Sequence, residues 1–399
     1  MSVRSFQRGS RVNMTIKNGM SFILRLGVLL LCLIVPRLAV AQDPPKPADP
    51  GPDPDNVTLN FFKSTEIGGL VDSYYLWNSN KVAPNYHAFD TKHNMFDVSM
   101  AELWVAKSAV LDSPIGYKIR LNFGSAPDLM ASASGQFAAE SPYKNIEEAY
   151  GSYMAPVGRG LQIDVGKFVT NAGAEVIEAK DDWNYSRSLL FQLAIPIYHA
   201  GIRLTYSPSD KVTVMGGVVN GWNDVTDDNS GKTVMASATF KPTAALSIIE
   251  NYIGGPEQPG NSSDWRHMSD TVVSYTVNPT ISVMGNYDFT TDTVGGSRVT
   301  TQGVAGYLKY QANTCVALVP RVEYFKDRDG APWATGIRDQ RLTEFTLTLE
   351  FKPAANFMWR VEYRGDFSNQ SPFVNDDGVA KTKQQSIVFG FLFNFSSKM

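Results

Sequence analysis

Residues 342–364 run LTEFTLTLEFKPAANFMWRVEYR, and this stretch decides the class of fold. Apolar and polar residues alternate in both of its halves, as expected for β-strands that have one apolar face. In the first half, Phe345, Leu347, Leu349 and Phe351 share one face, and Glu344, Thr346, Thr348 and Glu350 share the other. Pro353 then presets a turn, because proline cannot continue a strand ladder. The stretch therefore predicts an antiparallel β-hairpin with one apolar face and one charged face.

The same alternation recurs along the rest of the chain. In residues 115–123, one face carries Ile115, Tyr117, Ile119, Leu121 and Phe123, and the other carries Lys118, Arg120 and Asn122. In a soluble β-sandwich the apolar face would pack on a second sheet. In a membrane barrel it would face lipid while the charged face lines the lumen. The strands by themselves leave both architectures open.

The connections between the predicted strands fall into a short class and a long class. The short turns are 108–114, 155–160, 207–210, 241–244, 277–280, 311–313 and 352–355, and the long polar connections are 78–94, 124–145, 169–196, 223–231, 254–265, 290–298, 326–340 and 367–383. Outer-membrane barrels have short periplasmic turns and long extracellular loops, whereas a sandwich has no reason to segregate them. We therefore predict an all-β fold, a single transmembrane antiparallel β-barrel over residues 61–399. Seven turns and eight loops give sixteen strands, with fourteen or eighteen as alternatives.

The N-terminal region predicts export. Residues 1–41 carry only basic charges, then a ten-residue apolar run from Leu26 to Val35, and end in Ala39-Val40-Ala41, which is typical of a cleaved signal peptide. Its six basic residues leave with it, so the formal net charge changes from −3 to −9. Such an acidic protein is a poor nucleic-acid binder. Residues 42–60 begin with a proline-rich stretch that predicts an extended periplasmic spacer.

Candidate catalytic groups are scarce. The four histidines, His87, His93, His199 and His267, lie in no nucleophile motif, and one cysteine, Cys315, follows the leader. His87 and His93 lie near Asp90 and Asp97, but scattered histidines are far more common than a metal site. No phosphate-binding glycine loop is found. We therefore expect no enzyme, no cofactor and no metal.

One segment carries a family resemblance. It runs from Asp164-Val-Gly-Lys167-Phe168 through Asp182-Trp183-Asn-Tyr185 to Phe191, and the later pieces Ala200–Tyr206 and Asn220-Gly-Trp222 fit the same pattern. The chain resembles the second of the families of outer-membrane β-barrel porins. That resemblance implies an outer-membrane location and a water-filled channel for passive diffusion of small polar solutes or ions. It also makes a homotrimer plausible.

The third long connection, 169–196, is the candidate constriction, by analogy with sixteen-stranded porins in which that loop folds inward. Its charged residues are Glu175, Glu178, Lys180, Asp181, Asp182 and Arg187. The opposing pore wall would carry Lys118, Arg120, Arg203, Arg321, Arg360 and Arg364. Acids facing bases would filter ions by sign, and neutralising Glu175, Glu178 and Asp182 should reduce cation preference. The plainer alternative is that neighbouring charges, such as Arg321 and Glu344, simply pair.

The last predicted strand has alternate aromatic residues that include Phe391, Phe393 and Phe395. This pattern resembles the recognition signal of the barrel-assembly machinery, although four residues follow Phe395 where the usual signal ends on an aromatic residue. The rival to the porin hypothesis is a soluble or surface-exposed β-sandwich binding protein without channel activity. Membrane fractionation separates the two, since the porin should need detergent for extraction.

Overall fold

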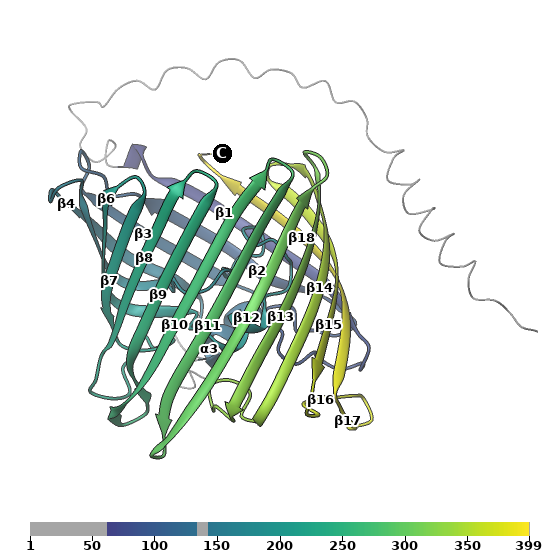
Figure 1. Ribbon diagram of the computed structural model, residues 1–399. Coiled ribbons are helices and arrows are strands. Elements are labelled where there is room, and N and C mark those ends of the chain that lie inside the picture. The colour runs from purple at the N-terminus through teal and green to yellow at the C-terminus, as the bar shows by residue number, and fades with distance from the viewer. Residues whose placement is uncertain (1–61, 134–142, 399) are drawn as a thin grey trace, which may run out of the picture. The chain divides into compact units, whose positions relative to one another are not determined.

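The computed structural model describes residues 62–133 and 143–398. The predicted signal peptide (1–41) and spacer (42–60) lie outside these residues. Sixteen long strands form one closed barrel, drawn in Figure 1, and a two-stranded sheet accompanies it. No helix among the described residues is both long and apolar enough to cross a membrane.

The barrel strands follow one another in chain order. They are β1 (Glu66–Asn78), β2 (Met95–Lys107), β3 (Ile115–Phe123), β4 (Ile146–Ala155), β5 (Leu161–Val169), β6 (Tyr198–Ser209), β7 (Val212–Val219), β8 (Thr233–Thr243), β9 (Leu246–Gln258), β10 (Asn261–Asn278), β11 (Ile281–Val294), β12 (Ser297–Gln311), β13 (Val316–Asp329), β14 (Arg338–Ala354), β15 (Phe357–Ser368) and β18 (Lys383–Ser396). The small sheet pairs β16 (Phe373–Val374) with β17 (Ala380–Lys381). The described residues also form two short helices, α3 (Ala126–Ala133) and α4 (Leu189–Leu193).

The barrel closes between its first and last strands. β1 pairs antiparallel with β18, in a register that runs from Gly68 opposite Ser396 to Asn78 opposite Ser386. The start of β1 and the end of β18 therefore lie at the same end of the barrel as the short turns. Closure leaves no free strand edge in the sheet, as a membrane-spanning sheet requires. The prediction of sixteen antiparallel strands is confirmed.

Two of the long connections were predicted wrongly. The segments 254–265 and 290–298 were expected to be loops, but β9 continues into β10 and β11 into β12 through two-residue turns. Gly260, Gly295 and Gly296 have φ between 58° and 77°, which suits tight hairpin turns. Polar residues can extend a hairpin into water, so polarity alone did not mark these segments as loops.

The two faces of the sheet differ as the alternation predicts. On β14 the outward Phe345, Leu347 and Leu349 are 37–42% exposed, whereas the inward Glu344 and Thr348 are fully buried. Outward apolar side chains with no protein over them are suited to lipid contact. Inward charges are covered because loops enter the lumen from the long-loop end.

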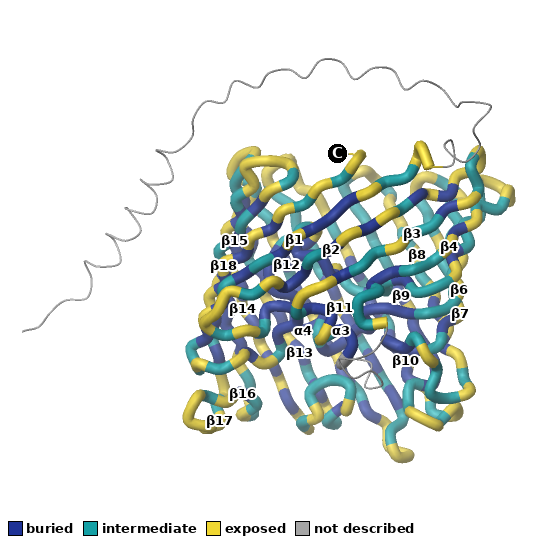
Figure 2. The backbone as a smooth tube through the Cα atoms, turned by 180° about the vertical axis from the view of Figure 1, so that it is seen from behind, coloured by how far each residue is buried: buried dark blue, intermediate teal, exposed yellow. Residues whose placement is uncertain are grey.

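An apolar core lies inside the barrel. It combines loop residues, such as Phe89 and Phe191, with inward strand residues, such as Met268 and Phe325. Figure 2 shows α3 and α4 at about the middle of the barrel height, behind and between the strands. The lumen is therefore partly filled by packed loops.

Candidate constriction site

The segment between β5 and β6, here called the inward loop (170–197), follows the lumen wall. Asn171 bonds Asn251 of β9, the amide of Gly173 donates to Asp270 of β10, and the amide of Ala174 donates to Asn286 of β11. Further along, the amide of Leu189 donates to Glu323 of β13. The loop thus lies along the wall from β9 onward, held by its own backbone.

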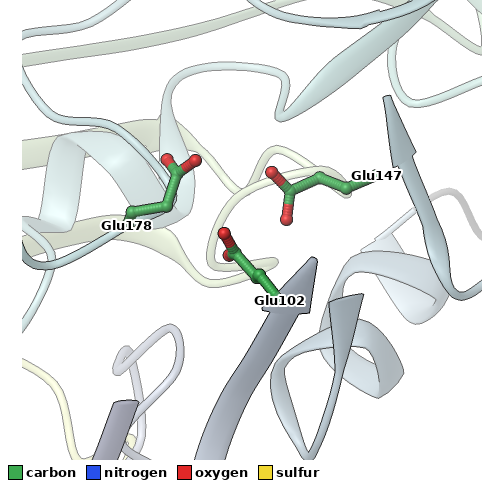
Figure 3. A group of neighbouring side chains, drawn as sticks. All are labelled: Glu102, Glu147 and Glu178. Atoms are coloured by element: carbon green, nitrogen blue, oxygen red, sulfur yellow. The ribbon is translucent and has the colours of Figure 1, made fainter. Parts of the chain in front are cut away.

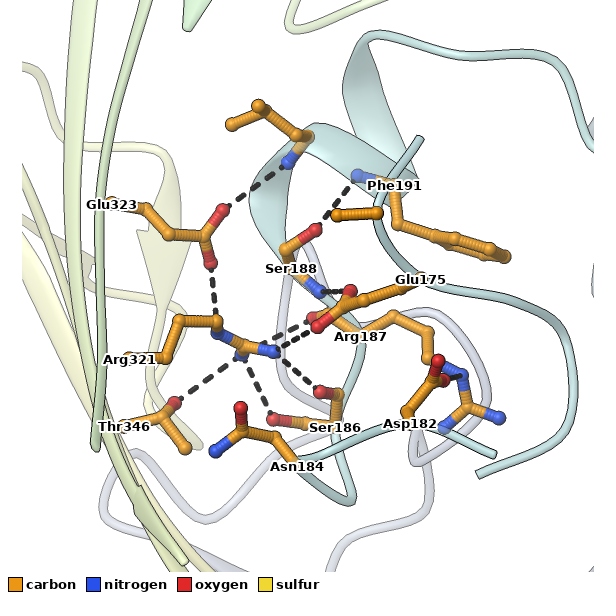
Figure 4. A network of polar contacts seen from close by, with 12 residues as sticks. Glu175, Asp182, Asn184, Ser186, Arg187, Ser188, Phe191, Arg321, Glu323 and Thr346 are labelled. Atoms are coloured by element: carbon orange, nitrogen blue, oxygen red, sulfur yellow. Dashed lines mark hydrogen bonds and ion pairs between the residues drawn. The ribbon is translucent and has the colours of Figure 1, made fainter. Parts of the chain in front are cut away.

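Arg321 of β13 is the centre of the network drawn in Figure 4. Its Nη1 lies 2.8 Å from Glu175 Oε1 and donates to the carbonyl of Ser186 at 2.7 Å. Its Nε faces Glu344 and Glu323, each at 3.1 Å. All of these side chains are buried, and charge-assisted bonds are stronger than neutral ones. Arg321 therefore ties the loop to the wall.

Arg360 and Glu362 of β15 continue this attachment. Arg360 pairs with Glu350 at 2.6 Å and donates to the carbonyls of Ala179, Asp182 and Asn184. Glu362 accepts hydrogen bonds from the backbone amides of Tyr185 and Ser186 at 2.6 and 2.9 Å. A guanidinium thus satisfies loop carbonyls while a carboxylate on the same face satisfies loop amides.

Arg364 links two loops to the wall. It donates to the carbonyls of Arg187, in the inward loop, and of Tyr86, in loop 79–94. Beside it, the Nδ1 of His87 lies 2.7 Å from Asp90, and its Nε2 lies 3.5 Å from Asp366. Burial and Arg364 lower the pKa of His87, but Asp90 and Asp366 outweigh them and raise it above 6.5. His87 therefore holds its proton more tightly in the folded protein than in the unfolded chain.

Tyr185 anchors the loop at the barrel seam. Its hydroxyl donates to Asp72 of β1 at 2.6 Å, and its ring lies over Gly390 of β18. A Cβ at position 390 would lie 2.3 Å from that ring, so no larger residue fits there without moving it. The seam where the barrel closes is therefore also a docking place for the loop.

On the opposite wall, Glu178 of the loop meets Arg120 of β3. Figure 3 shows Glu178 pointing toward Glu102 and Glu147, which come from β2 and β4. Oxygens of these three buried carboxylates lie within 4.8 Å of one another, a spacing that could suit a cation. However, Nη1 of Arg120 already lies 3.5 Å from Glu102 and 3.3 Å from Glu147. The guanidinium supplies the positive charge, so the arrangement is an ion-pair cluster.

The predicted site residues form several separate contacts. Glu175 contacts Arg321; Glu178 contacts Arg120; Lys180 contacts Asp181; Asp182 contacts Arg187; Lys118 contacts Glu148; Arg203 contacts Asp164; Arg360 contacts Glu350; and Arg364 contacts Asp366. The predicted wall residues Arg321, Arg360 and Arg364 lie beneath the loop and hold it. Sequence reasoning did not name Asp72, Asn184 or Tyr185 as site residues, although Asn184 and Tyr185 lie in the segment that carries the family resemblance. Alternation could have placed Asp72 on the lumen face, but no sequence signal names its partner.

Two cavities open at the short-turn end on either side of Lys180. One, of about 400 Å³, lies along β1–β5 and is lined by Trp104, Lys118, Arg120 and Gln162 among others. The other, of about 650 Å³, lies along β12, β14 and β15 and is lined by Trp183, Lys309, Glu350 and Arg360 among others. Lys180 lines both cavities.

A closed sixteen-stranded barrel with charged inner walls and an inward loop defines a porin-type outer-membrane channel. The chain belongs to the family described as "Putative beta-barrel porin-2, OmpL-like", whose sequence model matches residues 64–395. The family resemblance inferred from the sequence is thereby confirmed. No curated protein sequence matches the chain.

Solved structures with the same fold are porins and outer-membrane channels. An anion-selective porin from Comamonas acidovorans has a TM-score of 0.59 at 11% identity, covering 83% of this chain and 99% of its own. The trimer form of OmpT from Vibrio cholerae has a TM-score of 0.56 at 11% identity, with coverage of 83% and 99%. The channel DcaP of Acinetobacter baumannii has a TM-score of 0.53 at 12% identity, with coverage of 83% and 97%. At these identities the likeness concerns the fold alone.

Proposed function

We propose that the protein is a non-enzymatic diffusion channel for small polar solutes or ions, and that the inward loop is its constriction. The observation that carries the proposal is the position of this loop inside a closed barrel, bound to the wall through Arg321, Arg360 and Arg364. A narrow passage bounded by fixed charges sorts solutes by size and charge. Open cavities at the short-turn end give solutes space on one side of that constriction.

Conductance in a planar lipid bilayer tests this function. The refolded protein should give discrete current steps, with a reversal potential in a salt gradient that reports the preferred ion sign. The control is the same preparation after heat denaturation, which should give none. Folded protein, shown by its faster gel migration before boiling, that leaves the bilayer silent would refute the channel function.

Further aspects of the proposal concern export and assembly. The mature chain would begin at Gln42 after signal-peptide cleavage, which mass spectrometry of protein isolated from outer membranes can check. The outward Phe391, Phe393 and Phe395 are 43–44% exposed and would meet lipid and the barrel-assembly machinery.

A homotrimer is proposed because one structural relative is described as a trimer form. Crosslinking in native membranes tests that state.

A further inference from the structure

We infer that solutes pass between the inward loop and strands β2–β5, through a gate formed by Arg120 and Glu178, and that this route favours small anions. The inference rests on the proposed channel function and adds to it the side of the passage, the gate and the class of solute. It differs from the cation preference expected from the loop acids, because Glu175 and Asp182 are buried in ion pairs with Arg321 and Arg187. It depends on a difference between the two sides of the inward loop. One side faces β9–β15 and β1, and the other faces β2–β5.

The side of the loop that faces β9–β15 and β1 is closed by bonds to the loop backbone. Loop carbonyls at Ala179, Asp182 and Asn184 accept from Arg360, and the carbonyl of Ser186 accepts from Arg321. The side-chain amide of Asn184 also donates to the carbonyl of Val319 and to the hydroxyl of Thr348. These groups are buried, so separating them would expose many unsatisfied polar atoms at once. Trp183 and Arg360, on this side of the loop, line the larger cavity.

The side that faces β2–β5 is held differently, through the ends of side chains. Glu178 reaches Arg120, whose guanidinium borders the 400 Å³ cavity. Glu147, 3.3 Å from Arg120, also lines a small pocket toward the long-loop end, together with Lys144 and Lys167. Arg120, which contacts both Glu178 and Glu147, thus connects the lining of the 400 Å³ cavity with that of the small pocket. Rotation of the Arg120 and Glu178 side chains would join the cavity and the pocket. No hydrogen bond to the loop backbone would break.

The charges exposed along this route are mostly basic. Side chains of Lys118, Lys180 and Arg120 are 25%, 18% and 12% exposed, respectively. The acids paired with Lys118 and Arg120, namely Glu148, Glu102 and Glu147, are at most 2% exposed. Asp181, the partner of Lys180, is 55% exposed but lines the larger cavity and not the smaller one. A solute in the cavity is therefore closer to the basic groups than to the acidic groups. Less protein also lies between the solute and the basic groups, so their electrostatic interaction with it is the stronger one. The guanidinium carbon of Arg120 lies 5.2 Å from the ring centroid of Trp104. This cation–π contact helps to hold the positive group beside the cavity.

Matched glutamines on the two sides allow a direct test. Gln162 lines the smaller cavity and Gln311 the larger, and both are half-buried near the short-turn end. In a Cys315→Ser background, Gln162→Cys and Gln311→Cys would each be treated with an anionic sulfonatoethyl and a cationic trimethylammonium-ethyl methanethiosulfonate. Single-channel conductance is recorded before and after, and mass spectrometry verifies that each cysteine is modified.

We expect modification of Gln162→Cys to reduce single-channel conductance by about half or more, and modification of Gln311→Cys to reduce it by less than about a tenth. The anionic reagent should react with Gln162→Cys faster than the cationic reagent. Glu178→Gln should raise conductance, because the gate loses its ion pair. The proposed route would be refuted if modification of Gln311→Cys reduced conductance strongly, or if modification of Gln162→Cys left it unchanged. Faster reaction of the cationic reagent would overturn the anion preference. If the unmodified Cys315→Ser protein itself conducts nothing, the channel function fails, and this inference with it.

Discussion

At the scale of single residues, the charges predicted to face the pore divide into two roles. Arg321, Arg360 and Arg364 are buried and bind loop carbonyls, so they position the constriction. Arg120 and Lys118 keep part of their side chains exposed beside a cavity. Residue type and face could be predicted from alternation, but the role of each charge depends on whether the loop covers it.

Arg321→Met should lower the free energy of unfolding by about 3–5 kcal/mol, because it leaves Glu175, Glu323 and Glu344 buried without their counter-ion. Denaturant titration in lipid vesicles measures it. Arg159→Met is the control, since Arg159 pairs with Asp210 at an exposed turn and should cost at most about 1 kcal/mol. Equal losses in the two variants would contradict a central role for Arg321.

Loop 79–94 should loosen as the pH rises. Because the pKa of His87 is raised in the folded state, its stabilising contribution is complete below its ordinary pKa of 6.5 and is lost as the pH rises through the folded value. Amide hydrogen exchange over residues 85–91, corrected for intrinsic rates, should therefore show less protection at pH 9 than at pH 6. His87→Gln should abolish this difference, whereas His267→Gln, on the outer face, should preserve it. A difference unchanged in His87→Gln would exclude this histidine as its source.

At the scale of elements, strand geometry is local and loop conformation is not. The prolines at 208, 242 and 353 fall at register shifts near the ends of β6, β8 and β14, consistent with the predicted turns. The hairpins β9–β10 and β11–β12 extend through segments predicted as loops. The inward loop takes its path from partners more than 100 residues away, such as Asp72 and Glu362. Its course could therefore not be derived from its own composition.

Gly390→Ala should displace the inward loop, because the new Cβ would lie 2.3 Å from a ring carbon of Tyr185. We expect the bond between Tyr185 and Asp72 to weaken and single-channel conductance to rise, by roughly a factor of two if the constriction widens by one water layer. Gly285→Ala is the matched control, since its nearest neighbour, the carbonyl of Ala305, is 4.0 Å away. Conductance that stays constant in Gly390→Ala would show that this glycine does not position the constriction.

At the scale of the whole molecule, the apolar surface is turned outward and the ionic groups inward. The outward residues of β18, from Ile387 to Phe395, are 38–44% exposed, whereas Asp366 and Arg364 inside are almost completely buried. This is the reverse of a soluble protein, and it is stable only where hydrocarbon surrounds the sheet.

The intact protein should therefore resist release by high salt or alkaline washing of membranes and should dissolve only with detergent. Unboiled samples should also migrate faster in denaturing gels than boiled ones, because a closed barrel stays compact until heated. A soluble periplasmic marker from the same cells controls for incomplete lysis. Recovery of the protein in the soluble fraction would support the rival β-sandwich class.

The all-β class, the number of strands and the direction of the strand faces could be predicted from the sequence, because period-two alternation and turn residues act between near neighbours. The family followed from the segment between Asp164 and Phe191. The segment that enters the lumen was expected only by analogy with sixteen-stranded porins. Only the tertiary structure decided which wall that segment binds, which charges it covers and which stay open to a solute. Those outcomes depend on hydrogen bonds between residues that barrel closure brings together. Because these residues are far apart in the sequence, their pairing leaves no local sequence pattern.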